Sequence, residues 1–156
     1  MGDQPMETMV EQAGQVAVQA EPQPKGPKYG FYWGTGRRKT AVARVRIKAG
    51  DGKFEVNGKP FDKFFNEERD RNSAQLPLKV TEQVGRWDVF ANVQGGGFHG
   101  QADALMLGLA RALLAANAEF EPALRDHNLL SRDERKKERK KFGRRGARRG
   151  FQFSKR

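Results

Sequence analysis

The sequence predicts an α+β fold, in which a mostly antiparallel sheet carries helices on one face in a two-layer sandwich, followed by a long extended basic C-terminal tail. Two stretches, residues 40–48 ("TAVARVRIK") and 87–93 ("WDVFANV"), alternate with a period of two, as strands with one buried face do. A third, residues 101–116 ("QADALMLGLARALLAA"), repeats its apolar side chains with helical spacing. Strands therefore come first and the clearest helix follows them.

The first strand directs two kinds of side chain to opposite faces. Its apolar residues point one way (Ala41, Ala43, Val45 and Ile47), and its cations point the other way (Arg44, Arg46 and Lys48). Gly50-Asp51-Gly52 predicts a turn, and "KFEV" after it predicts a second strand. Asn57-Gly58 predicts another tight turn, and Pro60 should end the pairing.

Helices are expected at three places besides residues 101–116. "FDKFF" predicts a short helix with Asp62 as its cap. Residues 66–84 are ambiguous, and Pro77 is expected to forbid one continuous helix there. A short helix should begin near Pro122, because proline suits the first helical position.

Charge divides the chain into three parts. Residues 1–24 hold four acids and no base, which predicts a disordered acidic extension over residues 1–28. This extension lacks the basic start and apolar core of a signal peptide, and the arginines of a transit peptide. Residues 29–131 should form a globular α/β domain. Residues 132–156 hold thirteen bases and three acids, which predicts an extended tail.

The composition limits the classes of function. A formal net charge of +11 favours polyanionic partners. The chain has no cysteine and two histidines, so we expect no disulfide and no metal. No cofactor is expected either, for the reason given by the glycine motif in the next paragraph. No apolar run approaches the roughly 20 residues that a membrane span needs.

The stretch "GGGFHG" suggests an enzyme at first sight. Gly95, Gly97 and Gly100 have the G-x-G-x-x-G spacing of a dinucleotide-binding loop, and Glu119 lies near the place of a ribose-binding acid. That unit requires a second parallel strand after the helix, and no apolar strand follows residue 116. The glycines are therefore predicted to shape a tight strand-to-helix junction, which could also lie against phosphate.

"GTGRRKT", residues 34–40, is explained by its cations. It lacks the Gly-Lys-Ser/Thr ending of a P-loop, and a strand follows it in place of a helix. Arg37, Arg38 and Lys39 stand at the mouth of a strand that continues with Arg44 and Arg46. Guanidinium and ammonium groups on one short segment are typical of phosphate binding.

The tail also points to RNA. Ser131 and Glu134 have capping-box spacing, so a helix could extend into its first part, whereas Gly143, Gly146 and Gly150 disfavour a helix after Phe142. Phe142, Phe151 and Phe153 can stack on unpaired bases or pack against a protein. RNA is favoured over DNA, because no recognition-helix pattern is present, and over a membrane, because the tail has no apolar face.

Three motifs together resemble one family. "GTGRRKTAVARV", "GGGFHGQADALMLGLARAL" and "RKKFGRRGARRGFQFSKR" occur in the order and spacing of the ninth protein of the bacterial small ribosomal subunit. The resemblance covers about residues 30–156. It implies a structural, non-enzymatic, cytoplasmic protein of the small-subunit head that binds 16S-type rRNA beside neighbouring head proteins. The alternative is an RNA chaperone without a fixed ribosomal site.

The resemblance also implies which residues bind. The C-terminal tail would reach the anticodon stem-loop of the P-site tRNA through Ser154, Lys155 and Arg156. Together with the charge pattern, it assigns rRNA binding to Arg37, Arg38, Lys39, Arg44, Arg46, Lys136, Lys137, Arg139, Lys140, Lys141, Arg144, Arg145, Arg148 and Arg149.

Overall fold

The computed structural model describes residues 27–155, so most of the predicted acidic extension and Arg156 lie outside the described residues. Within these residues, five strands, four α-helices and one 3-10 helix follow one another. Their bounds are β1 (Tyr32–Arg38), β2 (Ala41–Ala49), β3 (Phe54–Val56), β4 (Lys59–Pro60), α1 (Phe61–Phe64), α2 (Glu68–Val80), β5 (Trp87–Gln94), α3 (Phe98–Ala116), η1 (Ala118–Phe120) and α4 (Glu121–Asp126).

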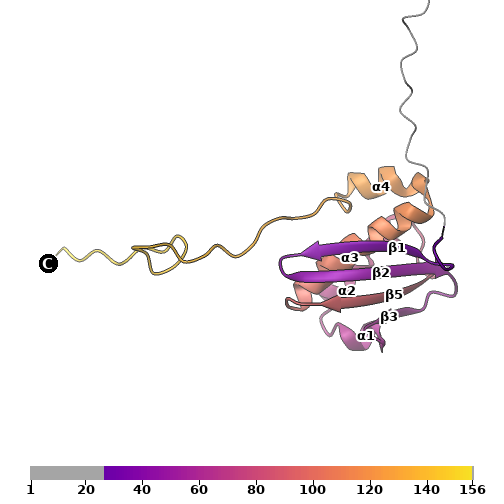
Figure 1. The fold of residues 1–156 in the computed structure, drawn as a ribbon, viewed down its shortest axis with the longest axis horizontal. Helices are drawn as coiled ribbons and strands as arrows, with labels where there is room; N and C mark the ends of the chain where they lie inside the picture. Colours follow the sequence, from indigo (N-terminus) through magenta and orange to yellow (C-terminus); the bar gives the residue numbers. More distant parts are fainter. Residues whose placement is uncertain (1–26, 156) are drawn as a thin grey trace, which may run out of the picture.

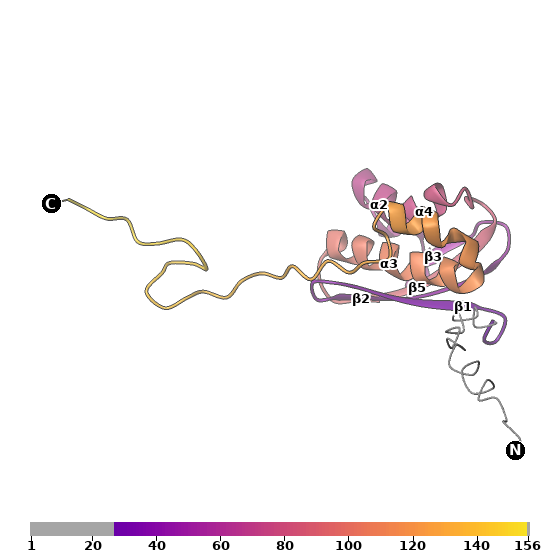
Figure 2. The same cartoon turned by 90° about the horizontal axis from the view of Figure 1, so that it is seen from above.

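The strands form one mixed sheet in the order β1-β2-β5-β3-β4. Neighbouring strands are antiparallel except β3 and β5, which run parallel. The helices lie on one side of this sheet, and among residues 27–155 the opposite side carries no helix or strand (Figures 1 and 2). The α+β, two-layer architecture predicted from the sequence is therefore confirmed.

The core lies between the sheet and the long helix α3. On β2, Ala41, Ala43, Val45 and Ile47 are fully buried, as their alternation predicts. They pack against an apolar stripe of α3 that includes Leu105 and Leu109, which are also fully buried. Removing this apolar surface from water is the main driving force for folding, at about 25 cal/mol per Å².

Strand β1 lies unusually close to α3. A Cβ atom built on Gly36 would stand 1.9 Å from the carbonyl oxygen of Ala104, and one built on Gly34 would stand 2.1 Å from that of Gly108. Glycine at these positions, facing Gly108 on the helix, lets strand and helix backbones touch directly. The two glycines of "GTGRR" therefore serve packing.

The sequence does not predict β1, because its two buried positions, Gly34 and Gly36, have no apolar side chains that could show the alternation of a strand. Elsewhere the predicted strands are present within a residue or two of their expected ends. The helix predicted from residue 101 begins earlier, at Phe98, with Gly97 as its N-cap. The helix near Pro122 is present as α4.

Two expectations about the helices are wrong. Helix α2 runs continuously through Pro77, which is fully buried and lies in the last turn, close to the helix end at Val80. There the carbonyl of Pro77 accepts bonds from both the amide and the hydroxyl of Thr81, which satisfy the helix end. Asp62 does not cap α1: the helix begins at Phe61 after Pro60, and no side chain caps it.

Candidate nucleic-acid interface

The side of the sheet opposite the helices, here called the outer face, is built from cross-strand rows. The strand register places Arg37, Val42 and Gln94 in one row, Thr35, Arg44 and Asn92 in the next, and Trp33, Arg46 and Phe90 in the third. Lys48 extends the surface beyond Arg46 along β2. The cations that alternation predicted on one side of β2 therefore meet Arg37 of β1 and the polar side chains of β5.

Three arginines of the outer face remain available for an external anion. Among residues 27–155, Arg37, Arg44 and Arg46 make no ion pair. Lys48 differs from these arginines because it makes an ion pair: its Nζ lies 3.5 Å from a carboxylate oxygen of Asp88. The pKa of Asp88 is lowered, first by a hydrogen bond from the backbone N–H of Lys53 and then, against its desolvation, by the charge of Lys48.

Aromatic rings surround Arg46. Its guanidinium carbon lies 5.4 Å from the ring centre of Phe31, 5.6 Å from that of Phe90 and 6.0 Å from that of Trp33. These distances are in the range of cation–π attraction. Trp33 is 48% exposed, so this part of the outer face offers both a flat ring and a cation to a partner.

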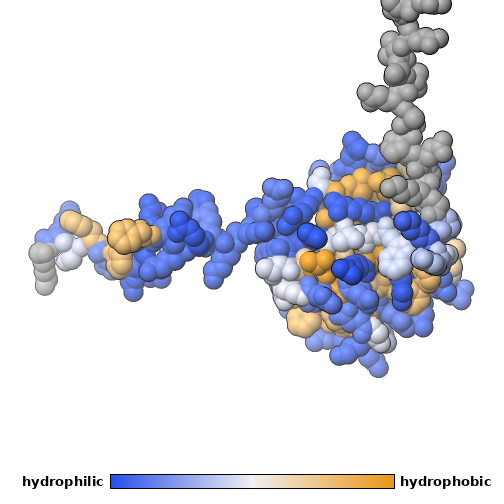
Figure 3. All heavy atoms as spheres, in the orientation of Figure 1, coloured by the Kyte–Doolittle hydropathy of each residue, from blue (hydrophilic) through white to orange (hydrophobic). Residues whose placement is uncertain are grey.

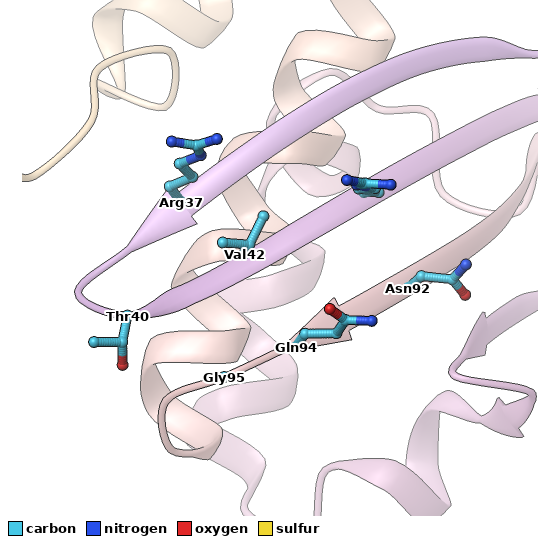
Figure 4. A pocket seen from close by; sticks show the side chains of 7 residues that line it. Arg37, Thr40, Val42, Asn92, Gln94 and Gly95 are labelled. Carbon is cyan, nitrogen blue, oxygen red and sulfur yellow. The ribbon is translucent and has the colours of Figure 1, made fainter.

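A hollow of about 550 Å³ lies next to these rows, at the end of the sheet where β1 turns into β2. Its lining comes from three adjacent strands and their ends (Figure 4): Arg37, Thr40, Val42, Arg44, Asn92, Gln94 and Gly95. The cations stand on β1 and β2, and the amides stand on β5. The hollow therefore combines positive charge with neutral hydrogen-bonding groups.

Arg38 points away from this surface and forms ion pairs within the protein. Its side chain is 13% exposed, and its guanidinium lies 3.4 Å from a carboxylate oxygen of Asp103 on α3 and 2.9 Å from one of Asp133. It also donates to the backbone carbonyls of Asp133 and Arg135. Arg38 thus connects the end of β1 to the helical layer and to the first residues of the tail. The sequence cannot reveal this, because the partners lie far along the chain.

The glycine loop is a tight junction, as the sequence predicts. Gly95 and Gly96 have φ of +74° and +67°, and a Cβ on Gly95 would stand 2.6 Å from the carbonyl oxygen of Thr40. Gln101 steadies the loop by donating to the carbonyl of Gly95. Within residues 27–155 no strand follows α3, so the second strand of a dinucleotide-binding unit is absent there.

Lys39 stands at the turn between β1 and β2. It is exposed and has φ of +52°. Together with Thr40 and the Gly96–Gly97 segment it lines a smaller hollow of about 210 Å³ at the start of α3. The predicted basic triplet is therefore divided among three places: the outer face for Arg37, the tail junction for Arg38, and the turn for Lys39.

The tail runs away from the domain on the side of the β1–β2 turn (Figures 1 and 2). Residues 132–155 contain no helix or strand, so the helix that Ser131 and Glu134 allowed is not formed. Figure 3 shows a mostly hydrophilic tail interrupted by a few hydrophobic groups, and Phe142, Phe151 and Phe153 are indeed strongly exposed. Ser154 and Lys155 are exposed at its far end.

The basic side chains of the tail are exposed as well. This holds for all nine assigned to rRNA: Lys136, Lys137, Arg139, Lys140, Lys141, Arg144, Arg145, Arg148 and Arg149. Glu138 lies 2.6 Å from Arg148 and 3.6 Å from Lys141, and these pairs draw residues 138–148 into a loop. The hydrogen bond from Arg148 lowers the pKa of Glu138.

A comparison with protein families decides the identity of the chain. The family model described as ribosomal protein S9/S16 matches residues 36–156, which include the basic triplet, the β2 and β5 parts of the outer face, the glycine loop and the tail. The chain belongs to the ribosomal protein S9/S16 family. This ribosomal protein S9/S16 chain is accordingly a structural constituent of the small ribosomal subunit in the cytoplasm, where it binds rRNA and takes part in translation.

None of the helices within residues 27–155 of this S9/S16 protein combines the length and apolar character that crossing a membrane requires.

Sequence reasoning missed one polar cluster of this S9/S16 protein. The Nδ1 of His99, at the start of α3, lies 2.5 Å from a carboxylate oxygen of the buried Asp70 on α2. The Nε2 of the same ring lies 3.9 Å from a carboxylate oxygen of Glu67. The hydrogen bond to Asp70 is the largest cause of a raised pKa of His99. One ligand atom from each of the three residues lies within 4.8 Å of the others, an arrangement a metal ion could use. The contact visible here is a link between two helices.

Proposed function

We propose that this protein is built into the head of the small subunit on 16S-type rRNA, with its outer face on the RNA and its tail reaching the P-site tRNA. One observation carries the proposal: basic residues of the outer face and of the tail meet at one hollow, and in this sense form a path. Arg37 on the outer face and Arg135 at the start of the tail both line this hollow, together with Asp103 and Asp133.

In this proposal the parts of the path have separate roles. Arg37, Arg44 and Arg46 contact rRNA phosphates from the outer face, and Lys39 does so from the turn. Arg38 sets the direction in which the tail leaves the domain. The basic side chains of the tail neutralise further phosphates, and each contact releases counterions from the RNA.

The end of the tail is proposed to contact the anticodon stem-loop through Ser154, Lys155 and Arg156. Two cations and a hydroxyl can hold a phosphate backbone without reading its sequence, which suits a site that must accept every tRNA. Neighbouring head proteins complete the surroundings of the domain. The protein acts by binding alone, and no bond is made or broken.

Sedimentation tests the proposal. Tagged protein from a lysate is centrifuged through a sucrose gradient in high salt, and its amount is compared with that of small-subunit rRNA. We expect co-migration with the small subunit at about one copy per particle. Protein that stays at the top of the gradient would contradict a built-in position and would favour the RNA chaperone.

A further inference from the structure

The hollow on the outer face contains more than phosphate binding requires. In the row Arg37–Val42–Gln94, a cation, an apolar side chain and an amide follow one another across three strands. Two strand spacings, roughly 10 Å, separate the first from the last. A cation, an apolar floor and a hydrogen-bonding edge match, in order, the phosphate, ring face and edge of one nucleotide.

We propose that this hollow binds one unpaired nucleotide of rRNA and reads its base through the side-chain amides of Asn92 and Gln94. The inference rests on the proposed RNA contact of the outer face, and it adds that one base is recognised there. Arg37 and Arg44 hold the phosphate or stack on the base, and Val42 supports the ring.

The two amides are free for a ligand. Asn92 and Gln94 are both exposed and point to the same face of β5. Their side-chain amides take part in none of the hydrogen bonds among residues 27–155. Asn57 is different, because its amide donates to the carbonyl of Val93 and accepts from the N–H of Val93, and so joins the turn after β3 to β5. A free amide presents a donor beside an acceptor, which is the pattern of a base edge.

The nucleotide must be unpaired. The side chains that line the hollow are attached directly to a sheet surface, and none projects as a helix or long loop does. The major groove of an RNA duplex is too deep and narrow for such side chains to read its bases, whereas bases of loops and bulges are open to them. Adenine is the best match, since Asn and Gln bind its amino group and adjacent ring nitrogen bidentately.

Binding of short RNAs to the full chain tests the proposal. The probes are labelled octamers of adenylate, cytidylate and uridylate, and a hairpin of equal length, measured by fluorescence polarisation. We expect the adenylate octamer to bind about fivefold or more tightly than the uridylate octamer, the discrimination that one bidentate pair supplies. The hairpin should show no such advantage.

The double variant Asn92→Ala/Gln94→Ala should bring the ratio between adenylate and uridylate close to one, while the salt dependence stays unchanged. Val42→Phe, which fills the hollow without removing a charge, should lower the same ratio. Asn66→Ala removes an exposed amide from the helical side and should leave the ratio as it is. Thermal melting of each variant shows that the chain remains folded.

Cross-linking provides a second measurement, in which the peptide that carries the adduct distinguishes RNA contacts of the outer face from those of the tail. Small subunits carrying the protein are irradiated, digested with trypsin and analysed by mass spectrometry. We expect a nucleotide adduct on the peptide of residues 87–111, which contains Asn92 and Gln94. Adducts restricted to tail peptides, or equal octamer binding with a normal salt slope, would overturn the reading of a base and leave the proposed function standing. Loss of all RNA binding by the unaltered chain would overturn the proposed function itself.

Discussion

Arg38 lies 2.9 Å from a carboxylate oxygen of Asp133, and this ion pair joins the end of β1 to the first residues of the tail. Both residues are partly shielded from solvent, and Arg38 also contacts Asp103 on α3. A single guanidinium therefore holds a strand, a helix and the tail together. The tail begins its course from a fixed point on the domain.

Replacing Arg38 with Met should free the start of the tail while leaving the domain folded. The methionine fills the space of the side-chain stem but donates no hydrogen bond. We expect trypsin to cut after Arg132 several-fold faster than in the unaltered chain, as measured by the appearance of the domain fragment. Arg125→Met removes an arginine that pairs with Glu121 on α4 and should leave this rate unchanged. Equal cleavage of all three proteins would mean that the tail is not held at Arg38.

The Asp133 carboxyl should titrate unusually low. A hydrogen bond from the Arg135 side chain, the largest cause, and one from its backbone N–H lower the pKa of Asp133 to about 2. Because the folded pKa lies below the ordinary value of 3.8, the stabilising contribution is present above pH 3.8 and is lost as the pH falls towards 2. We expect the carboxyl carbon in NMR spectra to titrate with a midpoint near 2, and nearer to 3.8 in Arg135→Ala. A midpoint near 3.8 in the unaltered chain would show that the contact does not exist in solution.

His99 should make the stability of the domain depend on pH. Its raised pKa, caused first by the hydrogen bond to Asp70, means that its contribution is complete below 6.5, the ordinary value, and declines as the pH rises through the folded value. We expect the difference in free energy of unfolding between the unaltered chain and His99→Gln to shrink from mildly acidic to mildly alkaline pH. Urea denaturation at several pH values measures it. A constant difference would contradict the charged pair.

Gly36 tests the contact between strand and helix. A Cβ at this position meets the backbone of Ala104 and Gly108, and backbone cannot move aside cheaply. We expect Gly36→Ala to lower the free energy of unfolding by about 3 kcal/mol or more, as overpacking in a tight core does. Gly97→Ser is the control, because a Cβ at Gly97 meets nothing within 4 Å and serine is a favoured N-cap. A small effect of Gly36→Ala would mean that β1 and α3 separate easily.

The outer face should contribute to the salt dependence of rRNA binding. Removing Arg37 and Arg44 by alanine substitution should weaken binding and reduce the slope of log affinity against log salt by up to about 0.9 per lost phosphate contact. Arg125→Ala, on the helical side, should leave the slope unchanged. An unaltered slope in the outer-face variant would place the RNA elsewhere.

Deleting residues 154–156 should separate assembly from tRNA binding. Small subunits that carry the shortened chain should assemble at normal yield, because the domain and most of the basic residues of the tail remain. Their affinity for P-site tRNA, measured by filter binding, should fall. Normal affinity would remove the tRNA contact from the proposed function.

The sequence revealed those parts of the fold whose side chains alternate or repeat. Strand β2 was predicted face by face, because burial requires small and apolar side chains at every second position there. Strand β1 was missed for the opposite reason: where the backbone itself touches α3, glycine replaces the apolar residues that signal a strand. The prediction that Pro77 interrupts the helix is wrong because, although proline in general disrupts a helix, a position in the last turn tolerates it.

The candidate site was predictable to the same extent. The outward cations of β2 follow from local spacing, so Arg44 and Arg46 could be assigned to one surface. Their meeting with Asn92 and Gln94 depends on the pairing of β2 with β5, which local spacing does not give. The partners of Arg38 and His99 come from distant segments, and no pattern in the sequence points to them.

The direct contact of β1 with α3 removes the layer of side chains that usually cushions one element against another. A slight shift of the helix would therefore be transmitted without damping to Arg37 on the far side of the strand. At β1 a single strand backbone therefore separates α3 from the outer face. Substitutions at the buried Ala104, Gly108 and Ala112 should consequently displace Arg37 and alter how the protein binds in the ribosome.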